Sequence, residues 1–216
     1  MESPPHKRNV GQEENRISML PDKLLLGMLE CLDLREAVRA GALSTRWRHL
    51  PHRLSRAYLS VCHFHHDTQL GRMDTFTGAL RSVLAKRKCD CQAIKTFNLR
   101  FLLSAPHLSS IGSAIENLVS LGEVKCLKLV ICSTQFSNST ALLLAEFGQQ
   151  LMSFTRAYPI AFRQVTFLQL SCFAFGPFGV SDLINSCDEL QYLSLKVCIL
   201  AGQHPVLKID TPCSAL

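Results

Sequence analysis

The stretch Leu190-Gln-Tyr-Leu193-Ser-Leu195 is one of four segments that share the outline apolar-x-x-apolar-x-Leu. The other three are Ile94-Lys-Thr-Phe97-Asn-Leu99, Val124-Lys-Cys-Leu127-Lys-Leu129 and Val165-Thr-Phe-Leu168-Gln-Leu170. Alternation of apolar and other residues over this length predicts β-strands. Residues 54–61 form a weaker copy of the pattern, and residues 206–209 resemble the start of another. The chain is therefore expected to contain a series of related strands.

Segments with helical periodicity lie between these strands. Their apolar faces are Phe76, Leu80, Val83 and Leu84; Ile111, Ala114, Ile115, Leu118 and Val119; Leu143, Phe147, Leu151 and Phe154; and Val180, Leu183, Ile184 and Cys187. Strand and helix alternating at a recurring interval are typical of a solenoid. The fold class predicted is α/β, with parallel strands on one face and helices on the other. Among the intervals that separate Leu99, Leu129, Leu170 and Leu195, only the last lies in the usual range of about 20–29 residues, so the repeats are irregular.

Composition sets the broad class of the protein. The chain has 216 residues, of which 47% are hydrophobic and 19% charged, a balance that excludes general disorder. Ten cysteines are fewer than a disulfide scaffold of this length needs, and the first 16 residues are too polar for a signal peptide. Apolar runs reach only about five residues, far short of a membrane span. We therefore expect reduced cysteines, no membrane partner, and a location in the nucleus or cytoplasm.

The basic excess of the chain does not point to nucleic acid. The net charge is +6, and the surplus lies before residue 110. The densest basic cluster is residues 86–88, at the end of a predicted helix, where cations interact favourably with the helix dipole. A nucleic-acid binder usually gathers its cations into a stripe or arm. No nucleic-acid partner is expected.

The N-terminal part of the chain lacks the strand pattern and instead predicts a tail followed by short helices. Residues 1–14 are expected to form a disordered tail. Beyond them, Leu24, Leu25, Met28, Leu29 and Leu32 share one helix face, a second helix is predicted over residues 35–43, and a third follows Ser44 and ends before Pro51. Three short helices bury little apolar surface alone. They should need a partner or the rest of the chain.

Residues 15–50, NRISMLPDKLLLGMLECLDLREAVRAGALSTRWRHL, resemble the F-box in the form found in plant F-box proteins. The matching positions are Arg16, Ile17, Ser18, Leu20, Pro21, Asp22, Leu24, Leu25, Ala37, Val38, Arg39, Leu43, Ser44, Arg46, Trp47 and Arg48. Residues 183–195 are the most typical part of a region similar to the irregular leucine-rich repeats of the same family. The resemblance implies a three-helix F-box over 15–54 and a leucine-rich-repeat-like array over 55–216, incomplete at its C-terminal end.

The same resemblance implies a function. F-box proteins tether a Skp-type adaptor, and through it a cullin, while their repeats hold a protein substrate for an SCF-type ubiquitin ligase. The chain would then be a non-catalytic subunit without cofactor, metal site or catalytic residue. The residues expected to bind the adaptor are Ile17, Leu20, Pro21, Leu24, Leu25 and Met28, with Val38, Leu43 and Trp47 beneath or beside them. Asp33 stands where the family usually has a proline, and we expect it to cap the second helix.

Several alternatives remain open at the level of sequence. The same apolar residues could simply form the core between the helices and the repeats. The chain could also be a repeat-based interaction protein, or a truncated family member, that is not coupled to ubiquitination. An enzyme would need a nucleophile with a nearby histidine and acid, which chain order does not exclude, yet no Gly-x-Ser-x-Gly, Walker or dinucleotide motif is present.

Two groups of cysteine and histidine residues are of types that bind metal or undergo redox chemistry, but their spacing favours structural roles. Cys62, His63, His65 and His66 lack the paired spacing of zinc ligands, so a polar loop is expected there. Cys132, Cys172 and Cys198 follow three of the predicted strands. Small, weakly polar side chains suit packing in the turn after a strand.

Overall fold

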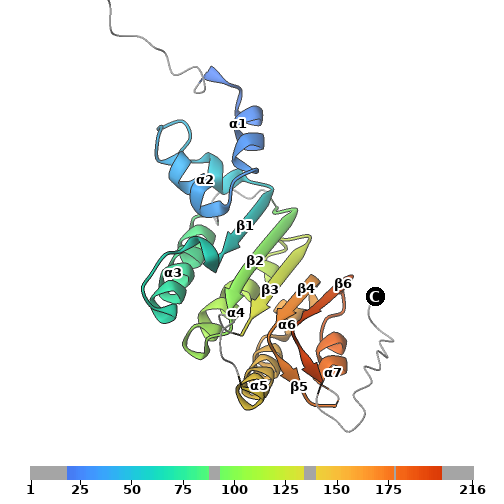
Figure 1. Cartoon of the computed structure of the whole chain (residues 1–216). Helices are drawn as coiled ribbons and strands as arrows, with labels where there is room; N and C mark the ends of the chain where they lie inside the picture. The colour runs from blue at the N-terminus through green and yellow to red at the C-terminus, as the bar shows by residue number, and fades with distance from the viewer. Residues whose placement is uncertain (1–18, 88–92, 134–139, 178, 201–216) are drawn as a thin grey trace, which may run out of the picture.

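The computed structural model describes residues 19–87, 93–133, 140–177 and 179–200. It is an α/β structure with a five-stranded, entirely parallel sheet in the order β1-β2-β3-β4-β6 (Figure 1). Its strands are β1 (Arg56–Ser60), β2 (Thr96–Leu102), β3 (Leu127–Cys132), β4 (Val165–Ser171) and β6 (Tyr192–Lys196). A short parallel pair, β5 (Ala174–Phe175) and β7 (Ile199–Leu200), lies beyond β4 and β6. The predicted parallel strands, including the weak copy before residue 61, are confirmed; residues 206–209 lie outside the described residues.

Helices follow the strands and cover one face of the sheet (Figure 1). They are α3 (Gln69–Arg87), α4 (Ala105–Ser120), α5 (Ala141–Ala157), α6 (Pro159–Arg163) and α7 (Gly179–Asn185). Each inner strand alternates buried and half-buried side chains, and Phe97, Leu99 and Phe101 of β2 point into the core at 0% exposure. This alternation is the pleat that the sequence pattern predicted. The core therefore lies between the sheet and the helices.

The turns after β4 and β6 have the same backbone conformation. Cys172 and Val197 both adopt a positive φ, 65° and 53°, directly after the register-paired ends Ser171 and Lys196. Non-glycine residues rarely adopt this conformation, so its recurrence shows that neighbouring units repeat the turn as well as the strand. Burial raises the pKa of the Cys172 thiol above its ordinary value. A protonated, buried thiol is a packing group rather than a nucleophile.

The N-terminal region contains α1 (Asp22–Leu29), α2 (Leu34–Gly41) and a 3₁₀ helix, η2 (Leu50–Arg53). The prediction of a third α-helix between Ser44 and Pro51 was wrong. Residues 45–49 form turns, and Pro51 lies in the first turn of η2 instead of ending a helix. A stretch of seven residues is too short to sustain α-helical hydrogen bonding by itself. Proline, which lacks an N–H, is tolerated at the start of a helical segment.

These helices share a core with the sheet. Leu25, Leu29, Leu34, Ala37 and Leu50 belong to the same continuous buried cluster as the inner strand residues. The Glu30 carboxylate accepts hydrogen bonds from the Ser55 backbone N–H at 2.9 Å and from the Ser55 hydroxyl at 2.6 Å, which ties the end of α1 to the start of β1. The short helices thus obtain from the rest of the chain part of the burial that they cannot provide alone.

Candidate partner-binding surface

An exposed apolar surface runs along α1 and α2. Leu24, Met28 and Leu32 follow at intervals of four residues and are 55%, 48% and 43% exposed. Met19, Val38 and Leu43 are exposed apolar residues of the same region. Exposed apolar side chains that are concentrated in one region of a protein, rather than scattered singly, mark interaction sites. We refer to these six residues as the α1–α2 apolar surface.

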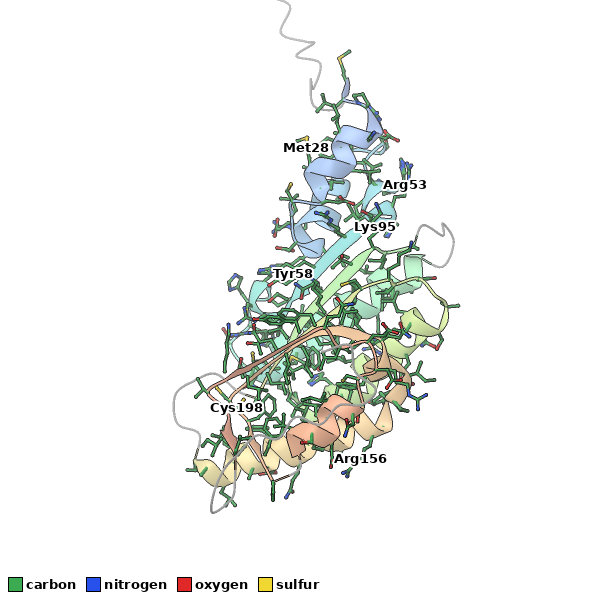
Figure 2. The ribbon with its side chains drawn as sticks, turned by 90° about the vertical axis from the view of Figure 1, so that its right-hand side faces the viewer. Met28, Arg53, Tyr58, Lys95, Arg156 and Cys198 are labelled. Atoms are coloured by element: carbon green, nitrogen blue, oxygen red, sulfur yellow. The ribbon has the colours of Figure 1, made fainter. Side chains whose placement is uncertain are left out.

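The surface exists because α1 is apolar on two sides. Leu25 and Leu29 face the core at 1% and 3% exposure, while Leu24 and Met28 project outward. In Figure 2, Met28 lies on the outer side of the N-terminal helices, on the side away from Arg53. A helix that only packed against the sheet would carry polar residues on its outward side. The second apolar side is thus not explained by the core of this chain.

Polar contacts fix the start of α1. The Arg46 guanidinium donates to Asp22 Oδ1 at 2.8 Å and to the Leu20 carbonyl oxygen, also at 2.8 Å. Arg53 lies 3.5 Å from the second oxygen of Asp22. The hydrogen bond from Arg46 holds the pKa of the Asp22 carboxyl below its ordinary value. These contacts orient Leu20 and Pro21 at the end of the apolar surface.

The start of α2 is fixed in a similar way. Asp33 caps the helix by accepting a hydrogen bond from the Glu36 N–H at 3.0 Å, as the sequence predicted. Its other oxygen lies 3.1 Å from His63 Nδ1. Arg35 donates to the carbonyl oxygen of His63 and lies over the Phe64 ring at 5.2 Å. These contacts hold α2 against η3 (Val61–His63) and leave Val38 exposed.

The structure refines the predicted adaptor-binding set. It places Pro21, Leu24 and Met28 on the surface, Leu20 and Trp47 at intermediate burial, and Leu25 in the core; Ile17 lies outside the described residues. Val38 and Leu43, expected beneath or beside the interface, are instead exposed at 37% and 82%. Leu25 is buried because two residues that are adjacent in a helix point about 100° apart. Met19 and Leu32 were missed, although Leu32 shares the i, i+4, i+8 spacing of Leu24 and Met28.

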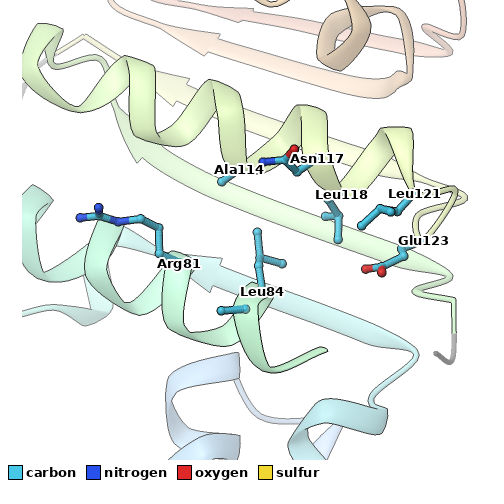
Figure 3. Close-up of a pocket in the computed structure, with 8 residues that line it drawn as sticks. Arg81, Leu84, Ala114, Asn117, Leu118, Leu121 and Glu123 are labelled. Atoms are coloured by element: carbon cyan, nitrogen blue, oxygen red, sulfur yellow. The ribbon is translucent and has the colours of Figure 1, made fainter. Parts of the chain in front are cut away.

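Other features of the described residues do not form a more convincing site. A cavity of about 240 Å³ between α3 and α4 is lined mainly by Leu84, Ala114, Leu118 and Leu121, with Arg81, Asn117 and Glu123 at its rim (Figure 3). In the described part of the chain, no three His, Cys, Asp or Glu side chains are grouped to hold a metal ion. No helix there is long and apolar enough to cross a membrane.

Serine, histidine and aspartate side chains lie within hydrogen-bonding distance of one another at one place between α3 and α4. The Ser104 hydroxyl lies 3.0 Å from His107 Nδ1, and His107 Nε2 lies 2.8 Å from Asp74 Oδ1. Ser104 is the residue before α4, and Asp74 belongs to α3. The imidazole is 5% exposed, so it bridges two packed helices from within their interface. This arrangement fits a structural link between α3 and α4.

Comparison with known proteins gives two relatives. No family model matches the chain. Over 40 residues, or 18% of this chain, it is 52% identical to an F-box/FBD/LRR-repeat protein of Arabidopsis thaliana, of which the match covers 9%. Over 112 residues, or 50% of this chain, it is 28% identical to a putative F-box/LRR-repeat protein of the same plant, of which the match covers 23%. The chain thus spans less than a quarter of either relative.

Proposed function

We propose that the chain is a member of the plant F-box/LRR-repeat proteins, two of which it resembles over part of its length, and that it is a non-catalytic substrate receptor of an SCF-type ubiquitin ligase. In this proposal the helices around α1 and α2 are an F-box that docks a Skp-type adaptor and, through it, a cullin. The strand–helix units are leucine-rich repeats that hold a protein substrate. The protein would act in the nucleus or cytoplasm.

The observation that carries the proposal is the α1–α2 apolar surface. α1 presents Leu24, Met28 and Leu32 outward although Leu25 and Leu29 already pack it onto the core. Covering these side chains with a partner would remove apolar area from water, at about 25 cal/mol per Å² before the costs of association. An amphipathic helix face that docks into an apolar groove is a common mode of protein recognition. The proposal requires the adaptor to present such a groove to α1.

Binding to a purified plant Skp-type adaptor tests this proposal. We expect the full chain to bind, and Leu24→Ala/Met28→Ala to weaken binding by about tenfold or more, since a central interface residue typically contributes over 1 kcal/mol. The matched control is Leu70→Ala/Leu142→Ala, which truncates two leucines that are 53% and 82% exposed on α3 and α5. The control should bind like the wild type.

Isothermal titration and co-purification both measure the result. Equal binding by the wild type and Leu24→Ala/Met28→Ala would show that the α1–α2 apolar surface is not the docking site. Absence of adaptor binding by the correctly folded wild type would reject the ligase role and leave a repeat-based interaction protein.

A further inference from the structure

The face of the sheet opposite the helices carries a row of large side chains. Tyr58, Asn98, Lys128, Phe167 and Tyr192 come from successive strands and are paired in register across all five of them. We call this side of the sheet the open face. The described helices α3, α4 and α5 lie on the other side (Figure 1). At the β1 end the open face is bounded by η3, where the His63 ring meets the Tyr58 ring edge-on at 5.5 Å.

The charge of the open face has one sign. The alternation along the strands places Arg56, Arg100, Lys128 and Lys196 on this face. None of the five strands contains an aspartate or glutamate. Acidic residues of the described repeat region lie instead on helices, such as Glu116 on α4 and Glu146 on α5, or in loops, such as Glu123 and Glu189. The basic side chains of the open face therefore have no acidic neighbour on any strand of the sheet.

An aromatic pair lies in the same row. The rings of Phe167 and Tyr192 are stacked, with centroids 4.6 Å apart and an interplanar angle of 5°. Lys128 Nζ lies 5.7 Å from the Phe167 centroid, on the neighbouring strand. Tyr192 is 52% exposed. The pair offers a flat apolar shelf next to a cation.

Two polar atoms near this row have no hydrogen-bond partner among the described residues. They are Asn98 Oδ1 and Arg100 Nε, both shielded from solvent. The Arg100 guanidinium also interacts with the Tyr58 hydroxyl on β1, so only part of this group lacks a partner. Buried polar atoms are nearly always paired in proteins, because leaving one unpaired is costly. A ligand group that donates to Asn98 and accepts from Arg100 would satisfy both.

We propose that the open face binds an acidic protein segment. Its carboxylates pair with Arg100 and Lys128, a backbone N–H of the segment donates to Asn98, and an apolar or aromatic side chain rests on the Phe167–Tyr192 shelf. Arginine is well suited to this role, since its planar fork matches a carboxylate. The inference rests on the proposed function in one respect: it names the class of substrate that the repeats would hold.

Single-stranded nucleic acid is the other polymer that cations and aromatic rings attract, but the geometry favours a peptide. Nucleic-acid sites space their aromatic residues so that successive bases stack on separate rings along a basic groove. Here Phe167 and Tyr192 stack on each other, and Lys128 is close to the Phe167 ring. The two rings therefore form a single shelf for one side chain, not the series of separate rings on which successive bases would stack.

Fluorescence anisotropy with the full chain and a labelled random copolymer of glutamate and tyrosine tests the proposal. We expect saturable binding that weakens as salt rises, because screening reduces charge pairing. Arg100→Gln/Lys128→Gln should bind about tenfold or more weakly. The matched control Arg81→Gln/Arg156→Gln removes the same charge from exposed positions on α3 and α5 and should change binding less than about twofold. Tyr192→Ser, at an exposed edge position, should also weaken binding with little risk to folding.

Three outcomes would overturn the proposal. They are no binding of the copolymer by the folded wild type, an equal loss in the control double variant, and binding of an oligothymidine of equal charge as tight as that of the copolymer. Adaptor binding is measured separately on the same variants. If Arg100→Gln/Lys128→Gln binds the adaptor like the wild type but no longer binds the copolymer, the two sites are independent. Rejection of the open face as a binding site would then leave the proposed ligase role untouched.

Discussion

Gly148 lies in the middle of α5 at the point where this helix meets β5. A Cβ built on Gly148 would overlap the carbonyl oxygen of Ala174, far inside the 3.0 Å that real Cβ atoms respect. The obstacle is backbone, so it cannot move aside as a side chain would. We predict that Gly148→Ala forces α5 away from β5 and destabilises the fold.

The magnitude follows from two opposing effects. Alanine gains about 0.8–1.0 kcal/mol over glycine in a helix interior. Overpacking a well-filled interface costs about 1–3 kcal/mol, and overlap with a fixed carbonyl group belongs at or above the upper end of that range. We expect Gly148→Ala to lower the free energy of unfolding by about 2 kcal/mol. For a chain of this length that corresponds to a melting temperature about 4–8 °C lower.

Gly78 provides the matched control. It is also inside a helix, α3, but it is exposed and a Cβ there would meet nothing within 4 Å. Gly78→Ala should therefore raise the free energy of unfolding by about 1 kcal/mol through helix propensity alone. Thermal and urea unfolding followed by circular dichroism measure both variants. A Gly148→Ala variant as stable as Gly78→Ala would refute the close approach of α5 to β5.

Further predictions concern the Glu30–Ser55 contact between α1 and β1, the Asp22 carboxyl and the buried Cys187 thiol. Glu30→Gln weakens the contact between α1 and β1 and should lower the free energy of unfolding, measured in urea, by about 1–2 kcal/mol. The control Glu36→Gln changes an exposed ion pair and should lower it by less than about 0.5 kcal/mol. Similar losses in the two variants would contradict a stabilising role of the Glu30–Ser55 contact. Because the pKa of Asp22 is lowered from 3.8, its stabilising effect is complete above that value and is lost as pH falls through its lower folded pKa. Melting temperatures of Asp22→Asn should thus fall less between pH 5 and pH 3 than those of the wild type, and parallel curves would reject the assignment. Burial raises the pKa of Cys187 to about 12, so iodoacetamide at pH 8 should alkylate exposed Cys31 and spare Cys187, as peptide mass spectrometry would show; equal labelling would mean that this part of the core opens readily.

The repeat pattern was readable from sequence because strand geometry is local. The period of two along residues 94–99, 124–129, 165–170 and 190–195 predicted strands whose ends lie within three residues of those observed. Strand ends were less certain, since pairing with a neighbour extends a strand beyond its own pattern. The third N-terminal helix was mispredicted for a related reason, because the turns of residues 45–49 lie in a stretch too short for its own hydrogen bonds to decide its conformation.

The candidate binding surface depended more on tertiary structure. Both Leu24 and Leu25 fit an apolar helix, and sequence could not tell which one faces the core and which a partner. That choice depends on how α1 is rotated against η2 and β1, where Leu25 is 1% and Leu24 55% exposed. Val38 and Leu43 moved from supporting to exposed positions for the same reason.

By itself, the sequence determined most of the elements: parallel strands with one apolar side, helices with one apolar face, and an N-terminal helix rich in apolar residues. Each of these depends on contacts between residues a few positions apart. The tertiary structure decided which sides remain uncovered, namely the α1–α2 apolar surface and the basic, aromatic open face. Those surfaces are assembled from residues of separate elements, Tyr58 to Tyr192 in the case of the open face, whose register is set by long-range pairing that no local pattern specifies.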